Sequence, residues 1–249
     1  MKLKIQKFTK FFSIIFLCLV LIWGCQCIPS LDTEKDITPS QYSRIMCVNC
    51  APLFDKVKIV VGEFTLHNSL DYDMEEGFKY FNVLPGVTNF VVIYKSDSVL
   101  YNGFANLSKG LPYTFLIIQL QKRIKGLLLY DTLSTYSPTN SYFRFVNVAV
   151  NSPSSLVFQI EQQYPIYFPL GFRSFTKFFT TYPEKYRITI KDADKDTTLF
   201  DIKNFQFLAG KGYSIILRGD FQTKETKLGT NLLIIQHNFD EIYNLDVKK

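Results

Sequence analysis

An internal repeat constrains the fold of this chain more than any other feature of its sequence. Three landmarks recur in the same order at a nearly constant offset. They are Asn49 and Asn147, 98 positions apart, Pro85 and Pro183, also 98 positions apart, and Tyr113 and Tyr213, 100 positions apart. About 100 residues is a typical size for one domain. The 249-residue chain is therefore predicted to contain two copies of one domain.

Within each copy, apolar and polar residues alternate with the period of two that is typical of β-strands. The predicted strands fall in residues 56–64, 89–104 and 112–120 of the first copy and in 155–164, 185–202 and 212–220 of the second. These runs are rich in Val, Ile, Tyr and Phe, which favour strands, and aromatic residues make up 16% of the chain. Turn residues separate the runs at the spacing of sandwiches and barrels.

The predicted fold class is all-β, with two tandem small antiparallel β-sandwich domains of the immunoglobulin-like or transthyretin-like kind. We expect alternate strand residues to be buried. The two domains are predicted at 41–132 and 141–238, with a joint rich in Ser, Thr, Asn and Pro at 131–141. The tail at 239–249 is predicted to be either an extra strand or loose. Residues 95–98 and 192–196 occupy equivalent places and are predicted hairpin turns.

The N-terminus carries four lysines and then an apolar run of 13 residues, Phe11–Trp23. This run is short for a membrane-spanning helix, which needs about 20 residues, and it matches the apolar region of a secretory signal. The ending Ile22–Cys25 resembles a bacterial lipobox, although Trp23 stands where a small residue is usual. We therefore predict a lipoprotein signal peptide at 1–24, cleaved between Gly24 and Cys25. The alternative is an uncleaved signal anchor.

Cys25 is the predicted lipidation site, carrying a thioether-linked diacylglycerol and an amide-linked acyl chain that anchor the protein to a membrane. Residues 25–40 then form a lipid-anchored tether, whose coil would span about 20 Å. By resemblance to other lipoproteins, Gln26 after the modified cysteine favours the bacterial outer membrane, on its periplasmic or its outer face.

The net charge of +6 comes largely from the leader. Without residues 1–24 the chain has 24 basic and 22 acidic residues, a net charge of +2. The predicted mature protein therefore has no excess of basic residues for nucleic acid.

The repeated elements resemble the domain of unknown function family numbered 4397. They are a Val-Asn step followed by Pro, a Pro-containing turn, a strand pair and a Gly-x-x-Tyr or Gly-x-Tyr strand entry, and they cover residues 42 to about 238. The segments 49–52 and 147–153 depart from the family's usual Asn-Ala-Ser-Pro. The resemblance implies a β-sandwich in tandem copies, often in secreted or lipid-anchored bacterial proteins. It implies no established activity and brings no catalytic residues.

Cys47 and Cys50 form a C-x-x-C pair at the end of a predicted strand. Strand alternation places Cys47 in the core. The two Cα atoms would lie about 10 Å apart in an extended strand, too far for a disulfide between them. Structural thiols are the favoured interpretation. The alternatives are a disulfide of Cys50, with Cys27 as a candidate partner, or a role in metal binding or catalysis.

Residues 71–76 and 192–196 are rich in carboxylates, which raises the question of calcium. The second segment has Thr197 where a tight-turn Gly belongs and Lys203 where a bidentate Glu belongs, and the first does not fit the spacing. Solvated turns are therefore favoured. With only His67 and His237 as further ligands, far apart in sequence, no metal site and no cofactor are predicted.

Residues 164–172 combine four aromatic residues with Pro165 and Pro169. If exposed, Tyr164, Tyr167 and Phe168 would contact a sugar or a partner protein. If buried, the segment caps the second sandwich as an edge strand, and burial is the favoured expectation.

No nucleophile elbow, P-loop or zinc-protease motif is present in the sequence. The function predicted is a lipid-anchored envelope protein acting as a non-catalytic structural or binding module for a glycan or another envelope protein. The alternative is an envelope glycan hydrolase that uses the carboxylates of Asp71, Asp73, Glu75 and Glu76.

Overall fold

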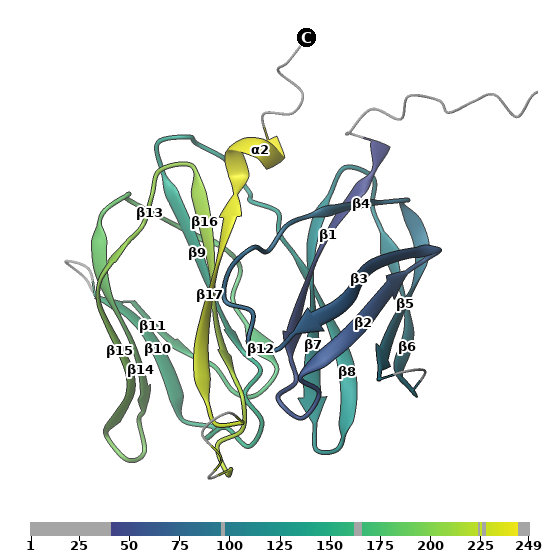
Figure 1. Cartoon of the computed structure of the whole chain (residues 1–249). Helices are drawn as coiled ribbons and strands as arrows, with labels where there is room; N and C mark the ends of the chain where they lie inside the picture. Colours follow the sequence, from purple (N-terminus) through teal and green to yellow (C-terminus); the bar gives the residue numbers. More distant parts are fainter. Residues whose placement is uncertain (1–40, 96–97, 162–165, 224, 226–227, 244–249) are drawn as a thin grey trace, which may run out of the picture. The chain divides into compact units, whose positions relative to one another are not determined.

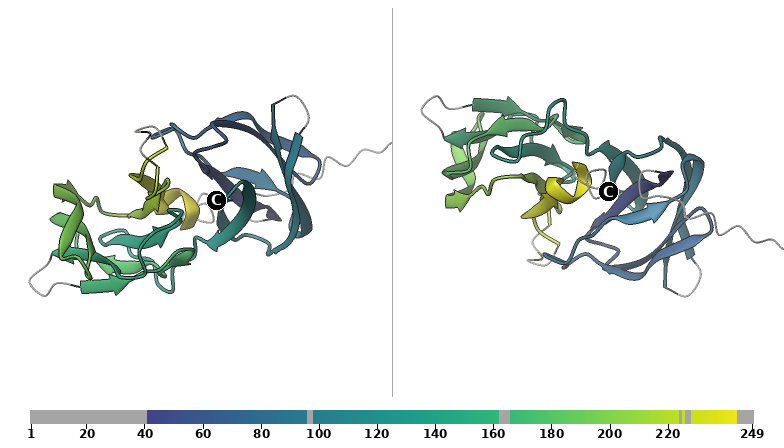
Figure 2. Two further views of the ribbon diagram at one scale, coloured as in Figure 1. Left: turned by 90° about the horizontal axis from the view of Figure 1, so that it is seen from below. Right: turned by 90° about the horizontal axis from the view of Figure 1, so that it is seen from above.

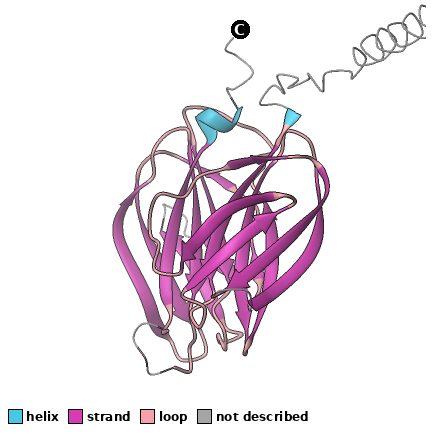
Figure 3. Ribbon diagram, turned by 45° about the vertical axis from the view of Figure 1, so that its right-hand side comes forward, coloured by secondary structure: helices cyan, strands magenta, loops and turns pink. Residues whose placement is uncertain are grey.

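The computed structural model describes residues 41–95, 98–161, 166–223, 225 and 228–243. The predicted signal peptide, the tether with Cys25, and Tyr164 lie outside these residues. Nearly all the secondary structure of the described residues is β-strand (Figure 3), which confirms the all-β prediction. None of the helices they form is long and apolar enough to cross a membrane.

The first repeat folds as two facing four-stranded sheets (Figure 1). One sheet has the order β4-β1-β7-β8 and the other the order β3-β2-β5-β6. The strands are β1 (Ser43–Cys50), β2 (Lys56–Val61), β3 (Phe64–Asp71), β4 (Phe81–Val83), β5 (Gly86–Tyr94), β6 (Ser98–Leu107), β7 (Pro112–Leu120) and β8 (Arg123–Tyr130).

The second repeat has the same plan. One sheet has the order β12-β9-β16-β17, with β13 also paired to β9, and the other has the order β11-β10-β14-β15. The strands are β9 (Ser141–Asn147), β10 (Leu156–Glu161), β11 (Ile166–Pro169), β12 (Ser174–Phe175), β13 (Phe179–Thr181), β14 (Lys185–Asp192), β15 (Thr197–Gln206), β16 (Lys211–Arg218) and β17 (Asn231–Asn238). The prediction of two β-sandwiches is confirmed.

One strand pair in each sandwich is parallel, which the purely antiparallel prediction did not include. β1 pairs with β7, with Arg44 opposite Pro112. β9 pairs with β16, with Tyr142 opposite Gly212. The register is therefore the same in both repeats. A parallel pair cannot be closed by a hairpin, and the chain passes through the other sheet between the two strands.

The repeated asparagines hold equivalent turns together. In both repeats the amide oxygen accepts a hydrogen bond from the backbone N–H two residues on, over 3.0 Å at Asn49 and 3.2 Å at Asn147. The amide nitrogen of Asn49 donates to Phe54 O at 2.7 Å, and that of Asn147 donates to Leu170 O at 2.9 Å. These side chains satisfy buried backbone groups at the same place in each sandwich, which explains their recurrence.

The repeated tyrosines have equivalent partners too. Tyr113 Oη accepts from the backbone N–H of Ser108 at 2.8 Å, and Tyr213 Oη accepts from that of Leu208 at 3.0 Å. Each bond reaches back five residues and fastens the loop that precedes β7 or β16. The hydrogen bonds of the repeated asparagines and tyrosines therefore lie within a single sandwich.

The prediction that alternate strand residues are buried is wrong for the parallel strands. β7, β9 and β16 are buried along almost their whole length, and so is β1. On β1, Cys47 packs into the core of the first sandwich, while Met46 and Val48 pack into a separate shared core. That shared core also contains Val146, Val148, Ile216, Leu233 and Ile235 of the second repeat. The outer faces of the two sheets therefore bury each other.

The tail after β17 is neither an extra strand nor loose over the residues described. It forms the short helix α2 (Phe239–Tyr243), in which Phe239 and Ile242 are buried. Arg44 Nη2 on β1 donates to the carbonyl of Ile242 at 3.1 Å. The helix thus packs across the boundary between the repeats. A run of five residues is too short for a helical pattern to be recognised in the sequence.

Candidate functional site

A buried polar network joins the two repeats at one side of the shared core, and it centres on Asp131. This carboxylate lies between β8 and β9 and has no exposed surface. Its Oδ2 accepts from Tyr80 Oη at 2.7 Å and from Thr114 Oγ1 at 2.6 Å. Its Oδ1 accepts from Arg144 Nη2 at 2.6 Å. Three donors therefore compensate for the burial of its charge.

Arg144 lies on β9 and its side chain is 2% exposed. In addition to Asp131, its guanidinium donates to Ser214 Oγ at 2.7 Å and to Tyr130 O at 3.1 Å. The guanidinium carbon also lies 4.5 Å from the centre of the Phe178 ring. Such a buried pair keeps its charges only when nearly all polar groups around it are bonded, as they are here.

His237 completes the network with one partner on each ring nitrogen. Tyr80 Oη lies 2.7 Å from Nδ1, and Ser214 Oγ lies 2.7 Å from Nε2. Because the Tyr80 proton goes to Asp131, the histidine must donate from Nδ1 and accept at Nε2 from Ser214. The imidazole is then neutral. Burial, with a smaller contribution from Arg144 and opposed by Asp131, lowers the pKa of His237 to about 4.

A Ser–His contact of this kind can make a nucleophile in a hydrolase. Ser214 and His237 are both fully buried, however, and Ser214 Oγ is already occupied as the acceptor of Arg144 Nε. A substrate has no access to this hydroxyl. The network therefore serves the joining of the two repeats rather than chemistry.

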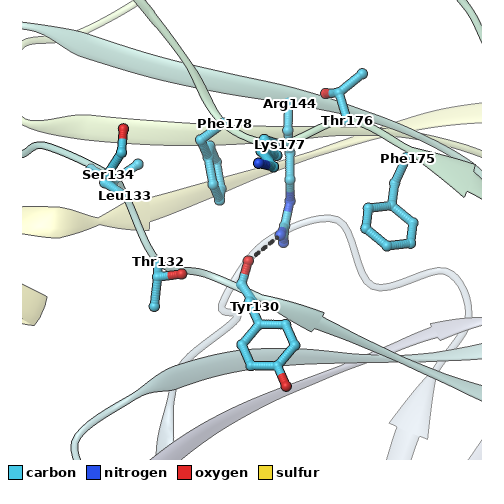
Figure 4. Close-up of a pocket in the computed structure, with 9 residues that line it drawn as sticks. All are labelled: Tyr130, Thr132, Leu133, Ser134, Arg144, Phe175, Thr176, Lys177 and Phe178. Carbon is cyan, nitrogen blue, oxygen red and sulfur yellow. Dashed lines mark hydrogen bonds between the residues drawn. The ribbon is translucent and has the colours of Figure 1, made fainter.

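A cavity of about 410 Å³ opens beside this network, and we call it the joint pocket. It is lined by Tyr130, Thr132, Leu133, Ser134, Arg144, Phe175, Thr176, Lys177 and Phe178. Figure 4 shows Arg144 between Phe175 and Phe178, with its guanidinium toward the carbonyl of Tyr130. The cavity lies in the size range of small-molecule sites.

The rim of the joint pocket is aromatic and positive. Tyr130 is 59% exposed and Phe175 is 47% exposed. Lys177 is exposed and forms no ion pair within the part of the chain that the structure describes. The hydroxyls of Thr132 and Ser134 add polar contacts, while no carboxylate lines the cavity. Rings, hydroxyls and a cation suit the binding of a polar ligand with apolar faces.

The residues expected from the sequence to contact a ligand lie elsewhere, on or beside β11. This strand is at the edge of its sheet, as the two prolines suggested. Tyr167 is 59% exposed, whereas Phe168 packs partly against the core of the second sandwich. The favoured expectation of burial is thus wrong for Tyr167 and is met only in part by Phe168. The structure does not bring them into the joint pocket.

Sequence reasoning missed the residues of the joint pocket. Tyr130 lies at the end of a strand and Phe175 in a strand of two residues, so neither follows a readable pattern. Arg144 carried a usable signal, because it is a charge between Phe143 and Phe145 in the middle of β9. A charged residue in such a strand is seldom buried without a partner.

Cys47 and Cys50 are both buried free thiols. Cys47 packs in the core of the first sandwich and Cys50 in the shared core. Burial raises both pKa values, that of Cys50 to about 12, although Arg218 opposes the shift there. The suggested partner Cys27 lies outside the described residues. Their burial fits the favoured interpretation of structural thiols.

The two carboxylate-rich segments lie at strand ends. Asp71 ends β3 and forms an exposed ion pair with Lys56 at 3.6 Å. Asp192 ends β14, where its Oδ1 accepts from Ser155 Oγ at 2.7 Å and where Lys195 lies 3.4 Å away. The hydrogen bond from Ser155 is the main cause that lowers the pKa of Asp192. No group of three or more metal-ligating side chains occurs among the described residues.

Comparisons with known proteins give no family. No protein-family model matches the chain, so the resemblance to the family numbered 4397 has no support from that comparison. No curated protein matches either.

Solved structures of proteins from Bacteroides and Parabacteroides species are distantly similar. A proposed cell adhesion protein of Bacteroides uniformis is 11% identical, with a TM-score of 0.26, over 79% of this chain and 98% of that one. A proposed adhesin of Bacteroides ovatus is 8% identical, with a TM-score of 0.23, over 79% and 94%. A proposed cell adhesion protein of Parabacteroides distasonis is 7% identical, with a TM-score of 0.22, over 80% and 99%. Likeness at this level carries no argument about function.

Proposed function

We propose that this chain is a lipid-anchored envelope protein that acts as a non-catalytic binding module. The observation that carries the proposal is the joint pocket, where the exposed rings of Tyr130 and Phe175 stand beside Lys177. Arg144, which the buried ion pair with Asp131 holds in place, lines the pocket. A preformed cavity loses little free energy in ordering itself around a ligand.

The ligand that suits the joint pocket is a glycan of the envelope. Sugar rings present apolar C–H faces that pack on aromatic side chains, and their hydroxyls bond to side chains such as Thr132 and Ser134. An acidic sugar would also pair with Lys177. Tyr167 and Phe168 remain proposed as a further contact, for the glycan or for another envelope protein.

The cellular location of the protein is part of the same proposal. Cleavage after Gly24 and acylation of Cys25 would anchor the chain to the bacterial outer membrane, and residues 26–40 would space the sandwiches from it. The resemblance of the repeats to the family numbered 4397 is consistent with such a protein. Among the cavities described here, none is lined by two carboxylates, so none supports the glycan hydrolase alternative.

Binding of envelope polysaccharide fragments to the full-length, membrane-extracted protein tests this proposal. Tyr130→Ala and Phe175→Ala should each weaken binding by about tenfold, the loss of one stacking ring. Tyr182→Ala is the matched control, because Tyr182 is 71% exposed and does not line the pocket. Equal binding by all three variants and the wild type would refute the joint pocket as the glycan site.

A further inference from the structure

The strands give the molecule two distinct ends, and we call the end where β1 begins the entry end. Ser43 is the first residue of β1, and its Oγ donates at 2.8 Å to the carbonyl of Ser108, just after β6. Ser141 Oγ makes the equivalent bond to Leu208 O at 2.5 Å, at the start of β9. The bond from Arg44 to α2 lies at this end as well. The entry end is at the top of Figure 1 and faces the viewer in the right panel of Figure 2.

Exposed apolar side chains concentrate at the entry end. Twelve large apolar side chains are exposed in the described ranges, and seven of them lie at or near strand ends on this side. The seven are Phe64, Leu84, Val87, Phe104, Tyr130, Tyr182 and Leu208. Ile166 and Tyr167 lie near the middle of their sheet, and Leu53, Val99 and Phe175 lie toward the opposite end. Scattered exposed apolar residues need no explanation, but a concentration on one end does.

In the first sandwich four of these side chains line one hollow. A cavity of about 450 Å³ is lined by Phe64, Leu84, Val87 and Phe104. These four side chains are 50%, 52%, 77% and 72% exposed. The only charged side chain in the lining is Glu63.

One polar atom in this hollow has no partner. The amide oxygen of Asn89, which lines the same cavity, is buried and accepts no hydrogen bond from the described residues. A buried acceptor left unbonded is costly. It would be satisfied by a donor that enters the hollow, such as the ammonium or hydroxyl group of a lipid headgroup.

The second sandwich repeats the feature at the equivalent loop. Tyr182 and Pro183 connect β13 to β14, as Leu84 and Pro85 connect β4 to β5, and Tyr182 is 71% exposed. A tyrosine there has an apolar ring and a polar tip, the combination that suits a membrane–water interface. Each repeat thus presents a large apolar residue directly before the equivalent proline.

We propose that the entry end is a lipid-facing surface that rests on the bilayer to which the chain is anchored. The inference rests on the proposed lipid anchor, because the 40 residues that precede the described chain lead into this end. A tether of residues 25–40 has a coil span of about 20 Å, so it keeps the entry end within reach of the headgroups. Apolar side chains on a protein surface stabilise such docking in proportion to the area they bury.

A tryptophan reporter tests this orientation. The chain has a single tryptophan, Trp23, in the predicted signal peptide. In a Trp23→Phe background, Leu84→Trp places a reporter at the entry end and Leu53→Trp places one at the opposite end, where Leu53 is 45% exposed. The anchored full-length variants are reconstituted in vesicles of phosphatidylethanolamine and phosphatidylglycerol, with and without bromine on the acyl chains.

We expect bromolipid to quench the Leu84→Trp emission at least twofold and to leave Leu53→Trp unchanged. Equal quenching of both reporters, or of neither, would overturn the proposal. A blue-shifted Leu84→Trp emission that bromolipid does not quench would also overturn it, because a second copy or a partner protein would then cover this end. Intact mass at Cys25 tests the anchor separately, so loss of the anchor and loss of the orientation are distinguishable.

Discussion

Arg144 Nη2 lies 2.6 Å from Asp131 Oδ1, and this ion pair ties the first strand of the second repeat to the segment that follows the last strand of the first. The partners are 2% and 0% exposed. Around them the two sandwiches contribute matching pairs, Thr114 with Asp131 and Ser214 with His237. Thr114 on β7 corresponds to Ser214 on β16, and Asp131, directly after β8, corresponds to His237 on β17, so the duplication itself supplied the framework of the network.

Removing one partner of the ion pair should strongly destabilise the protein. Arg144→Met leaves the Asp131 carboxylate buried without its cation, and such changes cost about 3–5 kcal/mol. Denaturation by urea would measure the loss. Arg187→Met is the matched control, because Arg187 pairs with Asp201 at 2.7 Å on the surface. That variant should unfold close to the wild type, as exposed pairs contribute little. Equal losses in both variants would contradict the role of the buried pair.

The repeat was recognisable from the sequence because its landmarks act within one sandwich. Asn49 and Tyr113 bond to backbone groups of their own repeat, so each copy keeps the same residue at the same place. The shared core follows a different rule. Arg144 of the second repeat corresponds in register to Met46 of the first, so a charged residue and an apolar residue occupy equivalent positions. A contact between copies needs different residues on its two sides, and a search for similarity between the copies does not reveal it.

The same reasoning explains the error in the burial pattern. Alternation predicts one buried face, so on β1 only the face that carries Cys47 was expected to lie in the core. Runs of consecutive apolar residues, 115–118 on β7 and 215–217 on β16, indicate strands buried on both faces, and they were present in the sequence. Such a run identifies burial but not the partner, because any second apolar layer would produce it.

Stability should fall as the pH drops from about 6.5 to about 4. The pKa of His237 is lowered by burial to about 4 in the folded protein, so the unfolded chain binds the extra proton more readily. Stability from this group is complete above pH 6.5 and is lost as the pH falls toward 4. The expected loss is about 3 kcal/mol, because each pH unit between the two pKa values contributes about 1.36 kcal/mol.

Urea midpoints at pH 7.5 and 4.5 would measure this dependence in the wild type and in His237→Gln. The pKa of His67 is also lowered by burial, so the test is the difference between the two proteins. His237→Gln should be less stable at pH 7.5 but should lose less stability on acidification. Parallel losses in both proteins would show that His237 does not titrate as the network requires.

Cys47 and Cys50 should resist thiol reagents in the folded protein. Both are buried, and burial raises their pKa values, so little thiolate forms at neutral pH. Iodoacetamide labelling followed by peptide mass mapping should find them modified only after denaturant is added. Rapid labelling of Cys50 in the native protein would contradict a closed shared core. Rapid labelling of Cys47 would contradict a closed core of the first sandwich.

The two repeated asparagines should be equally costly to remove. Asn49→Ala and Asn147→Ala each delete an acceptor and a donor that satisfy buried backbone groups, which costs about 1–3 kcal/mol per unsatisfied group. Asn68→Ala is the control, since Asn68 is exposed on β3. Urea denaturation should show similar losses for the two buried sites and almost none for the control.

The loss of stability should also extend to the other repeat, because the shared core couples the unfolding of both sandwiches. Two separate transitions in Asn49→Ala, with the second at the wild-type midpoint, would show instead that the sandwiches unfold independently.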